Sequence, residues 1–193
     1  MTGKKIGFIV AGVVVVAAIA AGLSAESAGV EAFGDIAIAG ETLPLYEAGV
    51  QDPAAGMIAP TITGDALSVV PGGTPKVVLF VAHWCPACQA EVPAITDWVE
   101  TNGAPAGVDV IGVATSSSPS QGNFPPSVWL EREGFPFPVI YDDEDSTAAI
   151  AYGLSAFPYW VVLDSDGRVV QRFTGQLPDQ AALSQLFSTA AGL

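Results

Sequence analysis

Apolar residues are distributed along this chain in short runs that alternate with amphipathic stretches, after a first and much longer apolar run. Short runs rich in Val and Ile are typical of buried strands, and they occupy residues 76–82, 108–114, 138–141, 159–163 and 168–174. Helical spacing of apolar positions, or a helix-capping signal, is found in residues 88–102, 127–133, 147–152 and 177–190. A short edge hairpin is predicted at residues 61–70, with its turn at Gly64 and Asp65. This order of elements predicts an α/β sandwich, which is a mixed central sheet with helices on both faces.

The first apolar run, residues 6–23, contains no charged side chain. As a helix it would be about 27 Å long, which is close to the thickness of the hydrocarbon core of a bilayer. Lys4 and Lys5 precede the run, which places this end in the cytoplasm and everything that follows outside. We therefore expect residues 1–25 to form a cytoplasmic stub and an uncleaved, single-pass anchor in the cell membrane. A cleaved signal peptide and a secreted protein are the alternative, because small residues follow the run.

Residues 26–51 are rich in Gly, Ala and Glu with little periodicity, so we expect a flexible spacer before one folded domain at residues 52–193. The formal net charge is −14, and all 20 acids but only four of the six bases lie from Glu26 onward. Such an acidic domain is not expected to bind nucleic acid or an anionic membrane surface. The acidic stretch at residues 142–145 is predicted to be a solvated turn before a helix capped by Ser146, with a calcium site as the alternative.

The only two cysteines, Cys85 and Cys88, lie where the predicted strand at residues 76–82 meets the helix that follows it. At a helix N-terminus, free backbone N–H groups and the helix dipole favour a thiolate, and a thiol one turn later can close a disulfide with the first. Pro86 occupies an early helical position, where its missing N–H costs little. A zinc site would need four ligands and haem attachment a histidine in place of Gln89, whereas the chain has two cysteines and one histidine. The spacing therefore indicates a redox-active pair and no metal, with a purely structural disulfide as the remaining alternative.

The sequence of residues 80–88 resembles the active-site strand and turn of thioredoxin-like proteins. Glu91 and Pro93 narrow the resemblance to the TlpA-type membrane-anchored thiol-disulfide oxidoreductases, and it covers about residues 52–190. It implies a thioredoxin-like three-layer sandwich and an extracytoplasmic enzyme that acts as a reductant on exported thiol or disulfide proteins. A membrane electron donor is the second partner that the resemblance implies. No cofactor beyond the cysteines is implied, and we expect a monomer.

Under this resemblance, Cys85 is the nucleophile that attacks a partner disulfide, and Cys88 resolves the mixed disulfide. Pro158, preceded by Phe157, corresponds to the cis-proline that faces the cysteine pair in thioredoxin-like proteins. Trp84 flanks the site and is expected to shield it, with core packing as the alternative. The expected substrate contacts are Trp84, Pro86, Ala87, Phe157 and Pro158.

Glu91 lies one helical turn beyond Cys88 and on the same helix face. A partly buried carboxylate there would raise the pKa of the thiols and could shuttle a proton during exchange. A solvated helix side chain is the alternative. The buried acid that thioredoxin carries on the preceding strand is missing, because the matching residue is Leu79. For His83, the only histidine, we expect a local packing role rather than acid–base catalysis.

Two other functions remain open at the level of the sequence. A binding module would present the groove at Pro158 to an exported partner and keep the cysteine pair as a permanent structural disulfide. A peroxiredoxin-like peroxidase shares the fold but normally carries a Thr-x-x-Cys site, and the residue three positions before Cys85 is Ala82.

Overall fold

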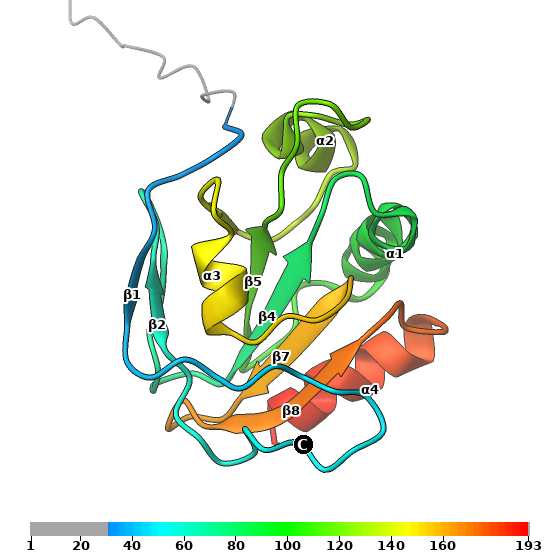
Figure 1. The fold of residues 1–193 in the computed structure, drawn as a ribbon. Helices are drawn as coiled ribbons and strands as arrows, with labels where there is room; N and C mark the ends of the chain where they lie inside the picture. The colour runs from blue at the N-terminus through cyan, green and yellow to red at the C-terminus, as the bar shows by residue number, and fades with distance from the viewer. Residues whose placement is uncertain (1–30, 193) are drawn as a thin grey trace, which may run out of the picture.

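The computed structural model describes residues 31–192, which build a five-stranded mixed sheet in the order β6-β5-β4-β7-β8 (Figure 1). The strands are β4 (Lys76–Val81), β5 (Asp109–Ala114), β6 (Val139–Tyr141), β7 (Tyr159–Leu163) and β8 (Val169–Thr174). Strands β4, β5 and β6 run parallel to one another; β7 is antiparallel to β4, and β8 is antiparallel to β7. The mixed central sheet predicted from the apolar runs is therefore confirmed.

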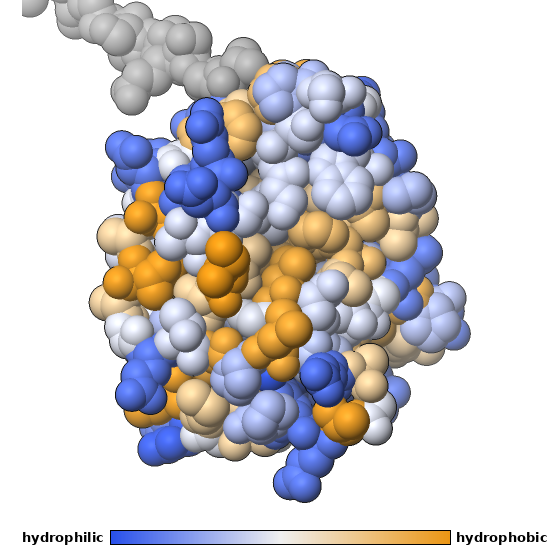
Figure 2. Space-filling model, in the orientation of Figure 1, coloured by the Kyte–Doolittle hydropathy of each residue, from blue (hydrophilic) through white to orange (hydrophobic). Residues whose placement is uncertain are grey.

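Helices cover both faces of this sheet. They are α1 (Pro86–Asn102), α2 (Pro126–Arg132), α3 (Thr147–Ala151) and α4 (Gln180–Ala190). Side chains of β4 alternate between the faces, as a strand buried on both sides requires. Leu79 packs in the core formed with α1 and α4, whereas Phe80 packs in the core formed with α3. The outer surface over α3 is partly apolar, because Ile150 stays exposed there (Figure 2).

A second, three-stranded antiparallel sheet lies beside α3 and consists of β1 (Ala37–Ala39), β2 (Thr61–Thr63) and β3 (Ser68–Val69). Strands β2 and β3 form the predicted edge hairpin, and β1 pairs with β2 so that Ile38 lies opposite the buried Ile62. The predicted membrane segment, residues 6–23, lies outside the described residues. Within residues 31–192, no helix combines the length and the apolar character needed to cross a membrane.

The expectation of a flexible spacer at residues 26–51 does not hold from β1 onward. Leu43 is buried, and its N–H donates to the carbonyl of Ala151 at 2.8 Å. The N–H of Tyr46 donates to the carbonyl of Gly153 at 2.9 Å. These apolar side chains and backbone hydrogen bonds attach the segment to α3 and the turn that follows it. The folded unit therefore begins before residue 52.

An ion pair in the interior holds the same segment to β8. The Arg172 side chain is fully buried and donates to both carboxylate oxygens of Asp52, from Nε to Oδ2 at 2.8 Å and from Nη2 to Oδ1. Its Nη1 donates to the carbonyl oxygens of Pro44 at 2.8 Å and Tyr152 at 3.2 Å. The guanidinium also lies 5.5 Å from the centre of the Tyr46 ring. A single arginine thus connects four positions on the N-terminal segment and the α3–β7 connection.

The acidic turn at residues 142–145 is only partly solvated, which corrects the prediction. Glu144 and Asp145 are exposed, but Asp142 is buried. The Asp142 carboxylate accepts hydrogen bonds from Thr115 Oγ1 at 2.6 Å and from the N–H groups of Ala148 and Ala149 at 2.9 and 3.1 Å. Ser146, the predicted cap, makes no side-chain cap hydrogen bond. Asp142 therefore satisfies the free N–H groups at the start of α3 in its place.

Candidate active site

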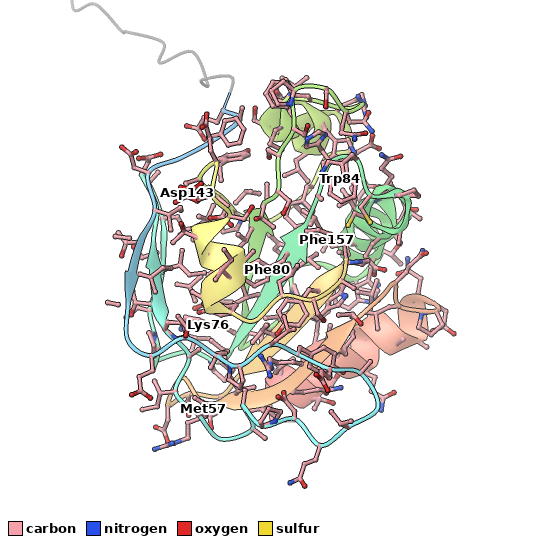
Figure 3. All side chains as sticks on the ribbon, viewed as in Figure 1. Met57, Lys76, Phe80, Trp84, Asp143 and Phe157 are labelled. Atoms are coloured by element: carbon pink, nitrogen blue, oxygen red, sulfur yellow. The ribbon has the colours of Figure 1, made fainter. Side chains whose placement is uncertain are left out.

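Three parallel strands end at the same edge of the sheet, and the loops that leave it bring the predicted site residues together. Val81 at the end of β4 pairs with Ala114 of β5, and Ala114 pairs with Tyr141 of β6. The loops that follow therefore carry Cys85, the serine-rich residues 115–120 and the acidic turn side by side. We call this side of the domain the active-site edge. Figure 3 shows Trp84 and Phe157 toward this edge.

The two cysteines are free thiols at the start of α1. Cys85 occupies the N-cap position, where its sulfur accepts a hydrogen bond from the N–H of Cys88 at 3.4 Å. Cys85 is 7% exposed and Cys88 is fully buried. Burial raises the pKa of the Cys88 thiol far above its usual range, and the nearby Cys85 and Glu91 raise it further. Cys85 is thus the thiol that a partner can reach, and Cys88 is the thiol that must lose a proton inside the protein.

An aromatic pair forms the surface next to the cysteines. Trp84 is 36% exposed, which excludes simple core packing, and its Nε1 donates to the carbonyl of Ser116 at 2.8 Å. The Trp84 and Phe157 rings meet edge to face, with centroids 5.7 Å apart. The bond between Phe157 and Pro158 is cis, as the resemblance implied. Pro158 is buried next to the start of β7, whose Tyr159 pairs with Phe80, so it lies at the same end of β4 as the cysteines.

Of the other two predicted substrate contacts, Pro86 is exposed and Ala87 is half-buried. Both lie in the first turn of α1, between the cysteines. The structure therefore places all five predicted contact residues around the ends of β4 and β7.

Glu91 is buried rather than solvated, with 1% of its surface exposed. Its Oε2 accepts a hydrogen bond from the N–H of Leu177, in the connection between β8 and α4, at 2.8 Å. Burial raises the pKa of Glu91 to about 7, although the Leu177 N–H favours the charged form. The carboxyl group is therefore close to half-protonated at neutral pH. The helical spacing predicted the position of Glu91, but no sequence signal identified Leu177 as its partner.

His83 has the structural role that was expected. Its side chain is buried, with Nδ1 2.7 Å from the carbonyl oxygen of Gly122 and Nε2 accepting from the N–H of Ser118 at 3.0 Å. These two partners assign the proton to Nδ1 and leave neither ring nitrogen free. His83 therefore connects the end of β4 to the loop between β5 and α2. That loop, rich in Ser and Pro, gave no sequence signal for this contact.

No metal-binding arrangement is found among residues 31–192, since no three His, Cys, Asp or Glu side chains are grouped as ligands. What the site offers is one thiol that keeps 7% of its surface exposed, a fully buried second thiol and a buried carboxyl group at the start of one helix. Such an arrangement can form and break a disulfide while moving a proton to and from the interior.

Comparisons with known proteins agree with this chemistry. A model of the Redoxin family matches residues 64–188. A thiol:disulfide interchange protein, DsbE homolog, of Paracoccus denitrificans is 31% identical over 102 residues, which are 53% of this chain and 51% of that protein. The thiol:disulfide interchange protein HelX of Rhodobacter capsulatus is 25% identical over 120 residues, or 62% of this chain and 63% of that protein. The chain thus spans between half and two thirds of the length of these relatives.

One solved structure shows the fold. The thiol:disulfide interchange protein, a thioredoxin family protein, from Chlorobium tepidum has a TM-score of 0.55 and 21% sequence identity, covering 72% of this chain and 99% of that chain. At this identity the likeness supports the thioredoxin-like α/β fold and nothing finer. The thioredoxin-like sandwich expected from the sequence is therefore confirmed, whereas the TlpA-type subgroup stays a prediction.

Proposed function

Because the chain belongs to the Redoxin family, we propose that it is a thiol-disulfide oxidoreductase whose Cys85 and Cys88 cycle between a dithiol and a disulfide. The observation that carries the proposal is the placement of Cys85 at the N-cap of α1, with Cys88 one turn behind it. The Cys85 sulfur accepts a hydrogen bond from the N–H of Cys88 at 3.4 Å, so the two cysteines are already next to each other for disulfide formation. No cofactor takes part, because the two sulfur atoms carry both electrons.

The exchange proceeds in two steps. The Cys85 thiolate attacks a disulfide of the partner, so that a mixed disulfide forms and the first partner sulfur leaves as a thiolate. The Cys88 thiolate then attacks the Cys85 sulfur, which closes the Cys85–Cys88 disulfide and releases the second partner sulfur. Two electrons pass to the partner, and Cys88 gives up its proton before it attacks. We assign that proton to Glu91, which lies one turn further along α1 and has a pKa of about 7.

We further propose that the enzyme is a TlpA-type protein anchored through residues 6–23, with its domain on the extracytoplasmic side. Its partners there are exported proteins that carry thiols or disulfides, and a membrane electron donor restores the dithiol. The names of the relatives as thiol:disulfide interchange proteins support the exchange of thiols and disulfides with a partner. A reductant role follows from the TlpA-type resemblance.

The full chain in detergent provides the test of this function. It should exchange with glutathione disulfide, and its reduction potential should lie toward the reducing end of the range of about −270 to −120 mV found for such pairs. A potential near the upper limit would make the protein an oxidant. A pair that stays oxidised and does not react with glutathione would favour the binding module with a structural disulfide.

Replacing Glu91 by glutamine should lower the pKa of Cys88, because the carboxylate charge that opposes the thiolate is lost. Exchange near pH 7 should nevertheless become slower, by up to about 100-fold, because the proton acceptor is lost as well. Thiolate absorbance in the ultraviolet and rates of glutathione exchange measure the two effects. The exposed Glu100 on the same helix is the matched control, and Glu100→Gln should change neither. Titration curves and rates that are identical in Glu91→Gln and wild type would reduce Glu91 to a packing residue.

A further inference from the structure

We infer that the active-site edge is the side of the domain that faces the membrane, so that Cys85 is presented to partners embedded in the same bilayer. This inference rests on the anchor at residues 6–23 that is part of the proposed function. It adds two points to that function. The first is the place where the chain from the anchor enters the folded domain, and the second is the surface that faces the bilayer as a result.

The first described residues lie against the active-site edge. The carbonyl of Glu31 accepts from the N–H of Ser127 in α2 at 3.4 Å, and the N–H of Gly34 donates to the carbonyl of Asp142 at 3.4 Å. The chain thus enters the domain between α2 and the acidic turn after β6. In Figure 1 this start of the coloured chain lies next to α2, at the end toward which the arrows of β4 and β5 point.

Two ring contacts extend from this entry point toward the cysteines. The Phe33 ring lies 6.4 Å from the Phe124 ring, and the Phe124 ring lies 5.7 Å from the His83 ring. His83 is two residues before Cys85 in the sequence. The N-terminal segment is therefore separated from the residues that precede the active-site turn by one aromatic side chain.

At Gly34 the backbone of the N-terminal segment is in close contact with the end of β6. A Cβ atom on Gly34 would lie 2.6 Å from the carbonyl oxygen of Tyr141 and 2.9 Å from Asp65 Oδ2. Both distances are shorter than a Cβ atom can approach another atom without a clash. Only glycine allows the chain to approach the end of β6 in this way. The position of the entry point is therefore part of the folded structure.

The connection to the anchor is short. Residues 24–30 separate the apolar run from Glu31, and seven residues extend over at most about 25 Å. A domain of this size is about 40 Å across. The active-site edge is consequently held near the bilayer surface, while the opposite edge, with the turn between β7 and β8, is directed away from it. Since the acidic turn on this edge exposes Glu144 and Asp145, we assign the edge to a protein partner and not to anionic lipid.

Energy transfer from single labelled cysteines to the lipid surface tests the orientation. In the full chain carrying Cys85→Ser and Cys88→Ser, a donor dye is attached after Gln121→Cys or after Ser165→Cys. Both positions are exposed; Gln121 lies in the loop that binds His83 and Ser165 in the turn between β7 and β8. The protein is incorporated into phosphatidylcholine vesicles that contain acceptor-labelled lipid. We expect transfer from Gln121→Cys to exceed that from Ser165→Cys at least about twofold, because the two edges lie about 40 Å apart.

A Gly–Ser insertion of about 20 residues after Ala28 should remove this difference, because the longer tether lets the domain rotate freely. The same insertion in the protein with both cysteines should leave exchange with glutathione disulfide unchanged. Equal transfer from the two positions without the insertion, or greater transfer from Ser165→Cys, would overturn the orientation. If neither labelled position transfers energy to the lipid, residues 6–23 do not anchor the protein in the bilayer, and the orientation is overturned as well. The labelled proteins lack Cys85 and Cys88, so they test the orientation alone. The proposed exchange activity is tested separately, in the wild-type protein.

Discussion

A Cys85→Ser variant is expected to lose disulfide exchange completely, with the rate falling to the uncatalysed background. Cys85 is the thiol nearer to solvent and occupies the N-cap of α1, so it is the sulfur that meets a partner disulfide. A serine hydroxyl at the same place does not form the anion that attacks sulfur at neutral pH. The measurement is the rate of glutathione disulfide reduction by the reduced protein. Equal rates in the variant and the wild type would refute the assignment of the nucleophile.

Cys88→Ser is the informative companion, because it separates attack from resolution. Cys85 can still attack glutathione disulfide, but no second sulfur releases the product. The variant should accumulate a glutathione adduct on Cys85 that mass spectrometry detects, with one glutathione per chain. Adduct on Cys85→Ser but not on Cys88→Ser would reverse the roles of the two thiols.

An Arg172→Met variant is expected to lose about 3 kcal/mol of stability, the lower end of the range for a broken buried pair, because the Asp52 side chain that loses its partner is still 16% exposed. The methionine also removes the donors to Pro44 and Tyr152. For a domain of this size, the melting temperature should fall by roughly 10 °C. Denaturant unfolding followed by circular dichroism gives the free energy. Arg132→Met is the matched control, since its pair with Glu133 lies at the surface and should contribute at most about 1 kcal/mol.

The contribution of this ion pair should depend on pH in a defined direction. The hydrogen bonds from Arg172 hold the pKa of Asp52 below its usual range. The stabilisation is therefore complete above the pKa of an unfolded aspartate, about 3.9, and is lost as the pH falls through the lower folded value. The difference between wild type and Arg172→Met should be largest near neutral pH and shrink under acid conditions. A difference that is independent of pH would assign the effect to lost packing alone.

The active-site helix and the strand before it could be predicted from the sequence because their signals are local. The Val-rich run at β4 requires only alternation over a few residues, and the spacing from Cys88 to Glu91 is one helical turn. That spacing placed Glu91 on the helix face of Cys88 but left its burial open against a solvated side chain, and the structure shows that both residues are buried. The cis-proline at Pro158 came from the family resemblance and not from any local signal.

The features that could not be predicted depend on partners far away in the sequence. Asp142 is buried because Thr115, 27 residues earlier, and the start of α3 satisfy its oxygens. Asp52 and Arg172 are 120 residues apart, and without their pairing the segment before β2 reads as a spacer. From composition alone such segments are predicted to be polar and irregular. Only the folded structure shows which of their charged side chains are paired.

The exposure of Trp84 has an optical consequence. Of the four tryptophans, Trp98, Trp129 and Trp160 are buried, and only Trp84 is substantially open to solvent. A neutral quencher such as acrylamide therefore reaches Trp84 first. Its indole adjoins Cys85 in the sequence and contacts Phe157, so the quenchable part of the emission reports on oxidation of the cysteines and on occupancy of this aromatic surface. The unlabelled protein carries its own fluorescent reporter.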